Sequence, residues 1–236
     1  MLVKTLKVYL ISEQFDKAGN SVDYKEVNKV LWELQKQTRE AKNRTVQLCW
    51  EWNNFSSDYV KANSMYPKDK DVLNYTLGGY VYDRLKEDYD MLSSNLSITL
   101  RDTCKSFNCY KKEIARGERS ILSFKSNQPL EIHNDAIKLE YKDNEFYVRL
   151  SLLNNAGKAK YGLGEYFLFK MTVKDNSTKT ILERCFDGVY KVGASFYMIK
   201  RKRCGNSICA MVLKIVLFTN LIKIKSLVSM WALAVL

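Results

Sequence analysis

Histidine, proline and C-terminal acidic residues are scarce in this chain. Only one histidine and two prolines occur in 236 residues, and no aspartate or glutamate follows Asp187. The lone His133, without a paired nucleophile, argues against a hydrolase triad. So few prolines, together with 46% hydrophobic residues, indicate a folded chain rather than a disordered one. The net charge of +12 favours a polyanionic partner, although residues 1–187 contribute only +4 of it.

The sequence also lacks the features of secreted and membrane proteins. Its six cysteines show no spacing typical of a disulfide framework, and its N-terminus has no apolar core followed by a small-residue cleavage site. Residues 204–236 are apolar, but Lys214, Lys223 and Lys225 interrupt them, so they contain no uncharged run of about 18 residues. These features predict a cytoplasmic protein with reduced thiols and no membrane contact.

Nuclease and metal-binding side chains are not grouped in the sequence. Metal-dependent phosphodiester cleavage needs several carboxylates around divalent ions, whereas Asp69-Lys70-Asp71 and Asp88-Tyr89-Asp90 hold carboxylates that diverge on a helix. Cys104-x4-Cys109 and Cys204-x4-Cys209 superficially suggest zinc, but His133 lies near neither pair. We therefore predict no catalytic residue, no metal and no cofactor in this chain.

Hydrophobic spacing predicts one strand followed by helices in the first half of the chain. Residues 3–12 alternate as in a β-strand, and Asn20 or Ser21 can cap a helix whose apolar positions recur from Val27 to Trp52. Residues 55–70 are predicted to be a loop, and residues 71–89 and 95–116 to be helices, the last ended by Gly117.

The second half of the chain is predicted to consist mainly of strands. The expected strands are residues 121–125, 137–141, 146–153, 166–173 and 189–200, with a short helix at residues 175–188. A lone strand, a helical insertion and then several strands indicate an α+β fold. In this fold a helical bundle interrupts a β-barrel after its first strand.

Several sequence blocks carry a family resemblance. They are Leu31–Thr45, Gln47–Tyr59 (QLCWEWNNFSSDY), Met65–Thr76 and Ser93–Ile132. In this order they resemble the helical recognition lobe of the miniature type V-F CRISPR effector nucleases, compact RNA-guided DNases related to transposon-encoded TnpB. The resemblance extends roughly over residues 5–203. It implies that residues 1–20 are the first strand of an OB-like wedge barrel, 21–118 the recognition lobe and 119–203 the rest of the barrel.

The resemblance also implies a function. The expected role is binding of guide RNA and target DNA, with a homodimer formed through the helical lobe. In such effectors a RuvC-like nuclease using Mg²⁺ follows the barrel, so this chain is expected to bind without cutting. Two alternatives stay open: a fragment of a TnpB-like transposon nuclease, and a membrane-tethered interaction protein that uses Ser207–Leu236 as its anchor.

Residues 204–236 follow neither the helical nor the strand pattern and are predicted to be out of frame. Because Met and Trp have single codons, Met230-Trp231-Ala232 forces Val-Gly in the shifted frame. That frame can read Gly-Val-Asp-Val-Gly, which resembles the first motif of the family's nuclease. A frameshift predicts loss of the barrel's closing strand, and an open sheet edge of this kind favours aggregation.

Basic side chains interleaved with aromatic rings are the candidate nucleic-acid contacts. Lys and Arg pair with phosphates, and flat rings stack on bases. The predicted contact residues are Arg39, Lys42, Tyr59, Lys61, Lys111, Lys112, Arg116, Arg119, Lys125, Lys200, Arg201 and Lys202.

Overall fold

A mixed fold of helices and sheet is seen in the computed structural model, which describes residues 2–16, 19–67, 76–126, 128–201 and 207–217. The strands are β1 (Leu2–Ser12), β2 (Leu130–Ile132), β3 (Ile137–Lys142), β4 (Glu145–Leu150), β5 (Phe167–Thr172), β6 (Tyr190–Val192), β7 (Ser195–Arg201) and β8 (Ser207–Leu217). The helices are α1 (Tyr24–Asn63), α3 (Leu77–Leu85), α4 (Ser93–Ala115), η1 (Asn134–Ala136), α5 (Asn155–Tyr161) and α6 (Asn176–Phe186).

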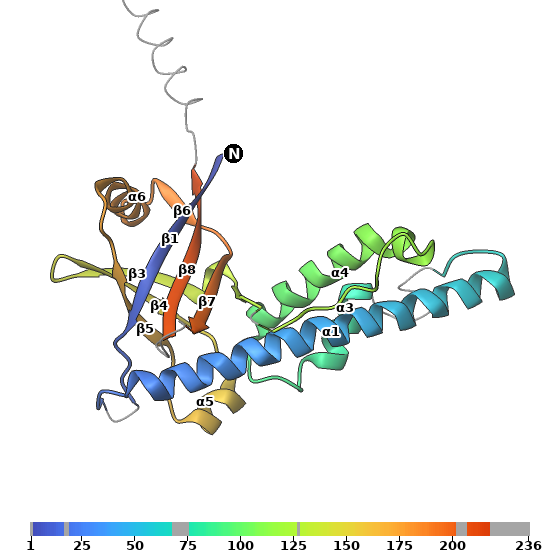
Figure 1. Cartoon of the computed structure of the whole chain (residues 1–236), viewed down its shortest axis with the longest axis horizontal. Coiled ribbons are helices and arrows are strands. Elements are labelled where there is room, and N and C mark those ends of the chain that lie inside the picture. Colours follow the sequence, from blue (N-terminus) through green and yellow to red (C-terminus); the bar gives the residue numbers. More distant parts are fainter. Residues whose placement is uncertain (1, 17–18, 68–75, 127, 202–206, 218–236) are drawn as a thin grey trace, which may run out of the picture.

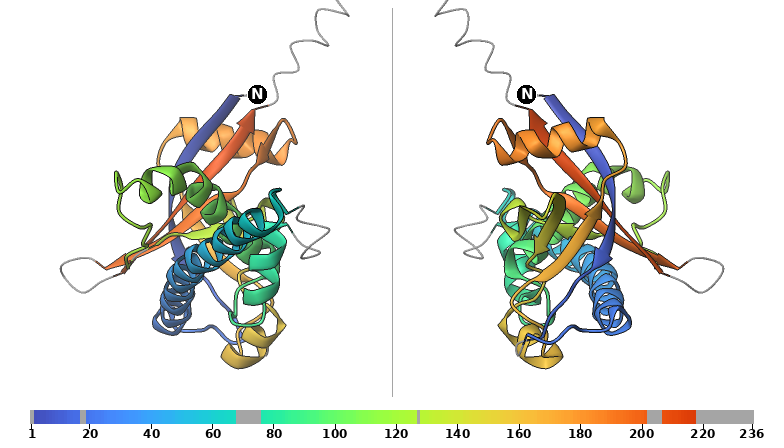
Figure 2. Two further views of the ribbon diagram at one scale, coloured as in Figure 1. Left: turned by 90° about the vertical axis from the view of Figure 1, so that its right-hand side faces the viewer. Right: turned by 90° about the vertical axis from the view of Figure 1, so that its left-hand side faces the viewer.

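The described strands form one curled antiparallel sheet. Its order is β2-β7-β8-β1-β5-β4-β3, and β6 pairs with β8. Alternation decides which face is covered: Leu6, Val8 and Leu10 of β1 are buried, whereas Tyr9 and Ile11 are exposed. The sheet lies at one end of the molecule, and α1 runs beneath it and continues beyond it beside α4 (Figures 1 and 2).

The long helix α1 connects the sheet to the helical arm. Asp23 caps it by accepting a hydrogen bond from the backbone N–H of Lys25. Its apolar stripe, which includes Val27, Leu31 and Leu34, is buried. In the arm it packs against α3 and α4.

Residues 55–63, predicted to be a loop, belong to α1. The polar run that suggested a loop is accommodated within the helix, since the Ser56 hydroxyl donates a 2.9 Å hydrogen bond to the carbonyl of Trp52. The helix ends only at Ser64, whose φ of 56° is left-handed and whose N–H bonds the carbonyl of Val60. That prediction was therefore wrong for residues 55–63.

Several other predicted elements are confirmed with shifted ends. Helix α4 and strands β3 and β5 match the patterns, and Gly117 has the left-handed φ of 76° expected after a helix. Residues 189–200, predicted as one strand, are divided between β6 and β7. The predicted helix at 71–89 corresponds to α3 (Leu77–Leu85). The prediction was wrong for residues 86–89, which are described and are not helical, and residues 71–75 lie outside the described residues.

Residues 207–217, predicted to be part of an aberrant tail, form β8. This strand lies between β7 and β1, and its register with β1 runs from Leu2↔Leu217 to Leu10↔Cys209. Met211, Leu213 and Ile215 alternate along it and are fully buried. The expected loss of a closing strand is therefore wrong for these residues. Residues 202–206 and 218–236 lie outside the described part, and the frame assignment stays a prediction.

A polar network around Asp90 joins α1 and the connection between α3 and α4 to α5. Its carboxylate accepts hydrogen bonds from Gln37 of α1 at 2.9 Å, and from Lys160 and Tyr161 of α5 at 2.8 and 2.9 Å. Its carbonyl accepts the N–H of Asn154. Burial raises the pKa of the Asp90 carboxyl, but the hydrogen bonds from Lys160, Gln37 and Tyr161 outweigh burial and hold this pKa below its ordinary value.

Asp90→Asn is expected to lower the free energy of unfolding by roughly 2 kcal/mol at pH 7, because charge-assisted hydrogen bonds are lost. A folded-state pKa below the unfolded value gives stability that is present above about pH 4 and lost as the pH falls through the folded pKa. The difference between wild type and variant should therefore shrink at pH 3. Urea unfolding at both pH values measures it. Asp102→Asn, which removes an exposed pair with Lys105, is the control and should cost under about 0.5 kcal/mol.

Candidate nucleic-acid interface

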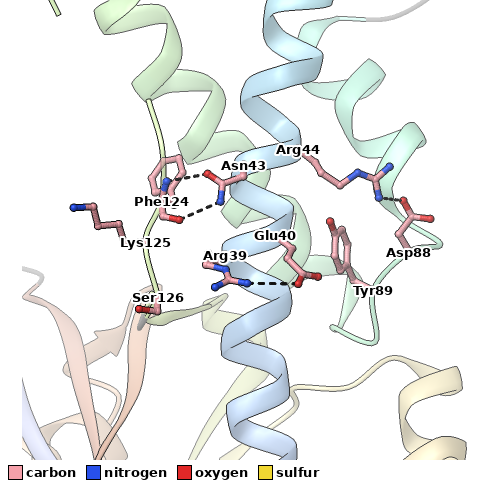
Figure 3. A pocket seen from close by; sticks show the side chains of 9 residues that line it. All are labelled: Arg39, Glu40, Asn43, Arg44, Asp88, Tyr89, Phe124, Lys125 and Ser126. Carbon is pink, nitrogen blue, oxygen red and sulfur yellow. Dashed lines mark hydrogen bonds and ion pairs between the residues drawn. The ribbon is translucent and has the colours of Figure 1, made fainter. Parts of the chain in front are cut away.

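A cavity of about 500 Å³ lies on α1 where two other segments meet it (Figure 3). Helix α1, the connection between α3 and α4, and the extended segment after α4 each contribute side chains. We name this cavity the α1 pocket, lined by Arg39, Glu40, Asn43, Arg44, Asp88, Tyr89, Phe124, Lys125 and Ser126.

The extended wall of the α1 pocket is attached to α1 by side chains. Asn43 donates to the carbonyl of Phe124 at 3.1 Å and accepts the Phe124 N–H at 2.8 Å. Gln35 donates to the carbonyl of Gln128 at 2.8 Å. Residues 121–125, predicted to be a strand, are therefore extended but unpaired with any described strand, because α1 satisfies the backbone groups of Phe124.

Lys42 was predicted to contact nucleic acid, and for this residue the prediction was wrong. Its ammonium lies 2.6 Å from Glu131, and the two side chains are only 8% and 9% exposed. The ammonium also lies 5.4 Å from the centre of the Phe124 ring. Buried between a carboxylate and a ring, Lys42 has a structural role and does not reach a phosphate on the surface.

The α1 pocket carries charges of both signs. Arg39 lies 3.7 Å from Glu40, and Arg44 donates a short hydrogen bond to Asp88. Burial lowers the pKa of the Arg44 guanidinium, but the bond to Asp88 outweighs this and the pKa lies above its ordinary value. Lys125 is exposed and forms no ion pair with any described residue. Cations are thus available at the rim of a pocket that also holds carboxylates.

A second basic group, the α4-end cluster, lies at the C-terminus of α4. It comprises Lys111, Lys112, Arg116 and Arg119. Arg119 stacks over Tyr110, with the guanidinium carbon 3.6 Å from the ring centre. Glu113 lies 3.3 Å from Arg119, and Arg116 lies 3.7 Å from Glu118. These pairs are exposed, so a polyanion can compete for the cations at little cost.

The remaining predicted residues lie elsewhere. Tyr59 and Lys61 are in the last turns of α1, where Lys61 pairs with Asp58 at 3.1 Å. Figure 1 shows α1 and α4 running away from the sheet in the same direction. Lys200 and Arg201 are the last two residues of β7, and Lys202 lies outside the described residues. The structure therefore brings Arg39 and Lys125 into one site and collects four others in the α4-end cluster.

Glu40, Asp88 and Tyr89 were missed by the sequence reasoning. Their charges and rings are ordinary for exposed helix and loop positions, and only tertiary contact puts Tyr89 beside Glu40 (Figure 3). The one signal in the sequence is Asp88-Tyr89-Asp90, an acidic pair around an aromatic residue, whose carboxylates were expected to diverge on a helix.

The described residues also bear on metal binding and on membrane insertion. Among the residues that the structure describes, no three His, Cys, Asp or Glu side chains are close enough to hold a metal ion. None of the described helices combines the length and apolar character that a membrane span requires.

A curated relative covers most of the chain. Over 177 residues the chain is 39% identical to the CRISPR-associated endodeoxyribonuclease Cas12f1 of Sulfoacidibacillus thermotolerans, an overlap of 74% of this chain and 42% of the relative. The chain thus spans less than half of that relative's length. No family model matches the chain.

Two solved structures share the fold. A cryo-EM structure of a Cas12f1–sgRNA–target DNA complex matches with a TM-score of 0.58 at 12% identity, over 91% of this chain and 58% of the other. A CRISPR–Cas12f ternary complex matches with a TM-score of 0.54 at 15% identity, over 84% of this chain and 43% of the other.

Identity of 39% over 74% of its length places this chain among the CRISPR-associated type V proteins, and within them it is Cas12f-like. The two solved structures share its fold.

Proposed function

We propose that this chain binds guide RNA and target DNA as the wedge and recognition part of an RNA-guided DNA endonuclease. The observation that carries the proposal is the α4-end cluster, in which Lys112, Arg116 and Arg119 are exposed and Lys111 is half-buried, on a helical arm of Cas12f-like sequence. Charged groups of this kind hold the phosphate backbone, while base pairing between guide and target reads the sequence. The proposed role is binding rather than cleavage, since cutting needs several carboxylates grouped around metal ions and the described residues contain no such group.

The proposed parts follow the order of the elements along the chain. Strand β1 comes first, the helices follow, and β2–β8 complete the sheet in which β1 lies between β8 and β5. We assign residues 21–118 to a recognition lobe inserted after the first strand of a wedge barrel, and residues 1–20 and 119–203 to that barrel. The relation to TnpB stays a prediction.

The membrane alternative is the weaker one. The membrane anchor of this alternative would begin with Ser207–Leu217, but these residues form β8, which pairs with three other strands. A segment in that position cannot at the same time begin a spanning helix.

A homodimer through the helical lobe is part of the proposal. Phe55 is 38% exposed on the C-terminal half of α1, and its ring lies 6.2 Å from that of Tyr59. Met65 and Tyr66 beyond the helix are also exposed. Exposed aromatic and Met side chains near the end of α1 suit a second copy of the lobe bound on the same RNA.

Removing the charges of the α4-end cluster is expected to weaken nucleic-acid binding at least tenfold near 0.1 M salt. The variant carries Lys111→Gln, Lys112→Gln, Arg116→Gln and Arg119→Gln. Each lost phosphate contact should also flatten the dependence of log K on log salt by roughly 0.7–0.9. Fluorescence anisotropy with a labelled RNA–DNA heteroduplex bearing a single-stranded RNA extension, titrated from low to high salt, measures both effects.

A variant with the same loss of charge on the sheet is the control. Lys4, Lys138, Lys142 and Lys174 are exposed and lie on or next to β1, β3 and β5. Changing all four lysines to glutamine should alter the slope of log K against log salt by no more than the loss of about one phosphate contact would. Equal weakening by both variants would mean that only net charge matters and that the α4-end cluster is not a site.

A further inference from the structure

The α1 pocket contains a buried polar group without a partner. Tyr89 is 6% exposed, and its O–H finds no acceptor among the described residues. Burial raises the pKa of this hydroxyl, although the charge of the neighbouring Arg44 guanidinium and a side-chain hydrogen bond from it oppose the increase. Because a guanidinium can only donate, the Tyr89 proton stays available to a bound molecule.

A smaller cavity of about 100 Å³ continues the α1 pocket along the helix. It shares Arg39 and Ser126 with the α1 pocket and adds Trp32, Gln35 and Lys36. Gln35 is 2% exposed, and its side-chain carbonyl oxygen also lacks a partner. A half-buried indole ring and a second unpaired polar atom thus lie beside the α1 pocket, as in sites that hold unstacked bases.

The charges of the α1 pocket indicate a nucleotide rather than a bare phosphate. Glu40 and Asp88 would repel a phosphate placed among them. Asp88 is occupied by Arg44, whereas Glu40 makes only one ion-pair contact with the described residues, at 3.7 Å, and keeps acceptor capacity. Lys125 at the rim can take the phosphate while Glu40, whose side chain is 44% exposed, takes N–H donors from a base.

We propose that the α1 pocket binds an unpaired guanine nucleotide of the guide RNA or of a DNA strand, a site that rests on the proposed nucleic-acid function. Guanine alone among the common bases presents two adjacent N–H donors, N1–H and N2–H, next to the O6 acceptor. A carboxylate pairs with both donors in the bidentate manner. Glu40 takes this role, and the hydroxyl of Tyr89, whose ring lies beside Glu40 (Figure 3), donates to O6. Adenine and cytosine offer one amino group, and uracil one imino group, so each leaves an oxygen of Glu40 unpaired.

Short oligonucleotides with one central base test the proposal. The full chain is titrated with labelled U4GU4, U4AU4 and the inosine analogue, which lacks N2–H, and with the DNA counterparts T4GT4 and T4AT4. The RNA or DNA 9-mer with guanine is expected to bind roughly tenfold more tightly than its adenine counterpart, with inosine in between. Preference in the RNA pair assigns the guide as the source, and preference in the DNA pair assigns a DNA strand.

Variants of the two proposed contacts complete the test. Glu40→Gln should abolish the guanine-to-adenine preference, and Tyr89→Phe should reduce it severalfold without lowering thermal stability. Glu33→Gln, on the same helix but outside the α1 pocket and paired with Lys36 at 3.6 Å, is the control and should keep the preference. Equal binding of guanine and adenine 9-mers, or the same loss in Glu33→Gln, overturns the inference. If the RNA–DNA heteroduplex still binds in that case, only the guanine site fails; if nothing binds, the proposed function fails with it.

Discussion

Lys42→Met is expected to lower the free energy of unfolding by about 3–5 kcal/mol, the cost of leaving one charge of a buried pair alone. Glu131 is 9% exposed, one of its oxygens already lacks a partner, and the other accepts from Lys42 at 2.6 Å. Without the ammonium, this carboxylate would have to be protonated or to reach water. The contact between the ammonium and the Phe124 ring would also be lost, and with it part of the attachment of the extended segment to α1.

Urea unfolding at pH 7 measures this effect, and two further variants identify its cause. Lys36→Met removes an exposed pair on the same helix and should cost under about 0.5 kcal/mol. The double variant Lys42→Met with Glu131→Leu should recover most of the lost stability, because no charge is then left buried. If the free energy of unfolding of Lys42→Met alone lies within about 1 kcal/mol of the wild-type value, Glu131 reaches water without its partner.

Removal of β8 is expected to abolish cooperative folding, whereas removal of residues after Leu217 is expected to preserve the fold. Strand β8 pairs with β1, β6 and β7. Its Met211, Leu213 and Ile215 are each 0% exposed, and burial of such side chains contributes roughly 1.5–3 kcal/mol apiece. Their sum is comparable with the whole stability of a typical domain, about 5–15 kcal/mol. Strand β1 would also lose the longer of its two strand pairings.

Two shortened chains test this prediction. One ends at Leu217 and the other at Arg201, and thermal unfolding followed by circular dichroism compares them with the full chain. The chain ending at Leu217 should unfold in one cooperative transition, and the chain ending at Arg201 should show none. Leu213→Ala in the full chain gives a graded readout and should cost about 2–5 kcal/mol. A cooperative transition in the chain without β8 would contradict the central role of this strand.

The candidate site could be predicted only in part. Residue type and position along the chain were enough to select Arg39 and Lys125, which line one pocket, and the four members of the α4-end cluster. The same reasoning selected Lys42, since its spacing on a polar helix face resembles that of Arg39. Its partner Glu131 lies 89 residues away, and no local pattern indicates that the two will be buried together.

The sequence by itself determined where most helices and strands form. The 3.6-residue spacing in α4 and the alternation in β3 and β5 report which face of each element avoids water, and this depends on neighbouring residues only. Tertiary structure decided what each face contacts. Residues 121–125 became an extended wall because Asn43 holds Phe124, and Ser207–Leu217 became a central strand because β1 and β7 lie on either side of it. Backbone hydrogen bonds and buried charges need partners, and those partners come from segments far apart in the chain.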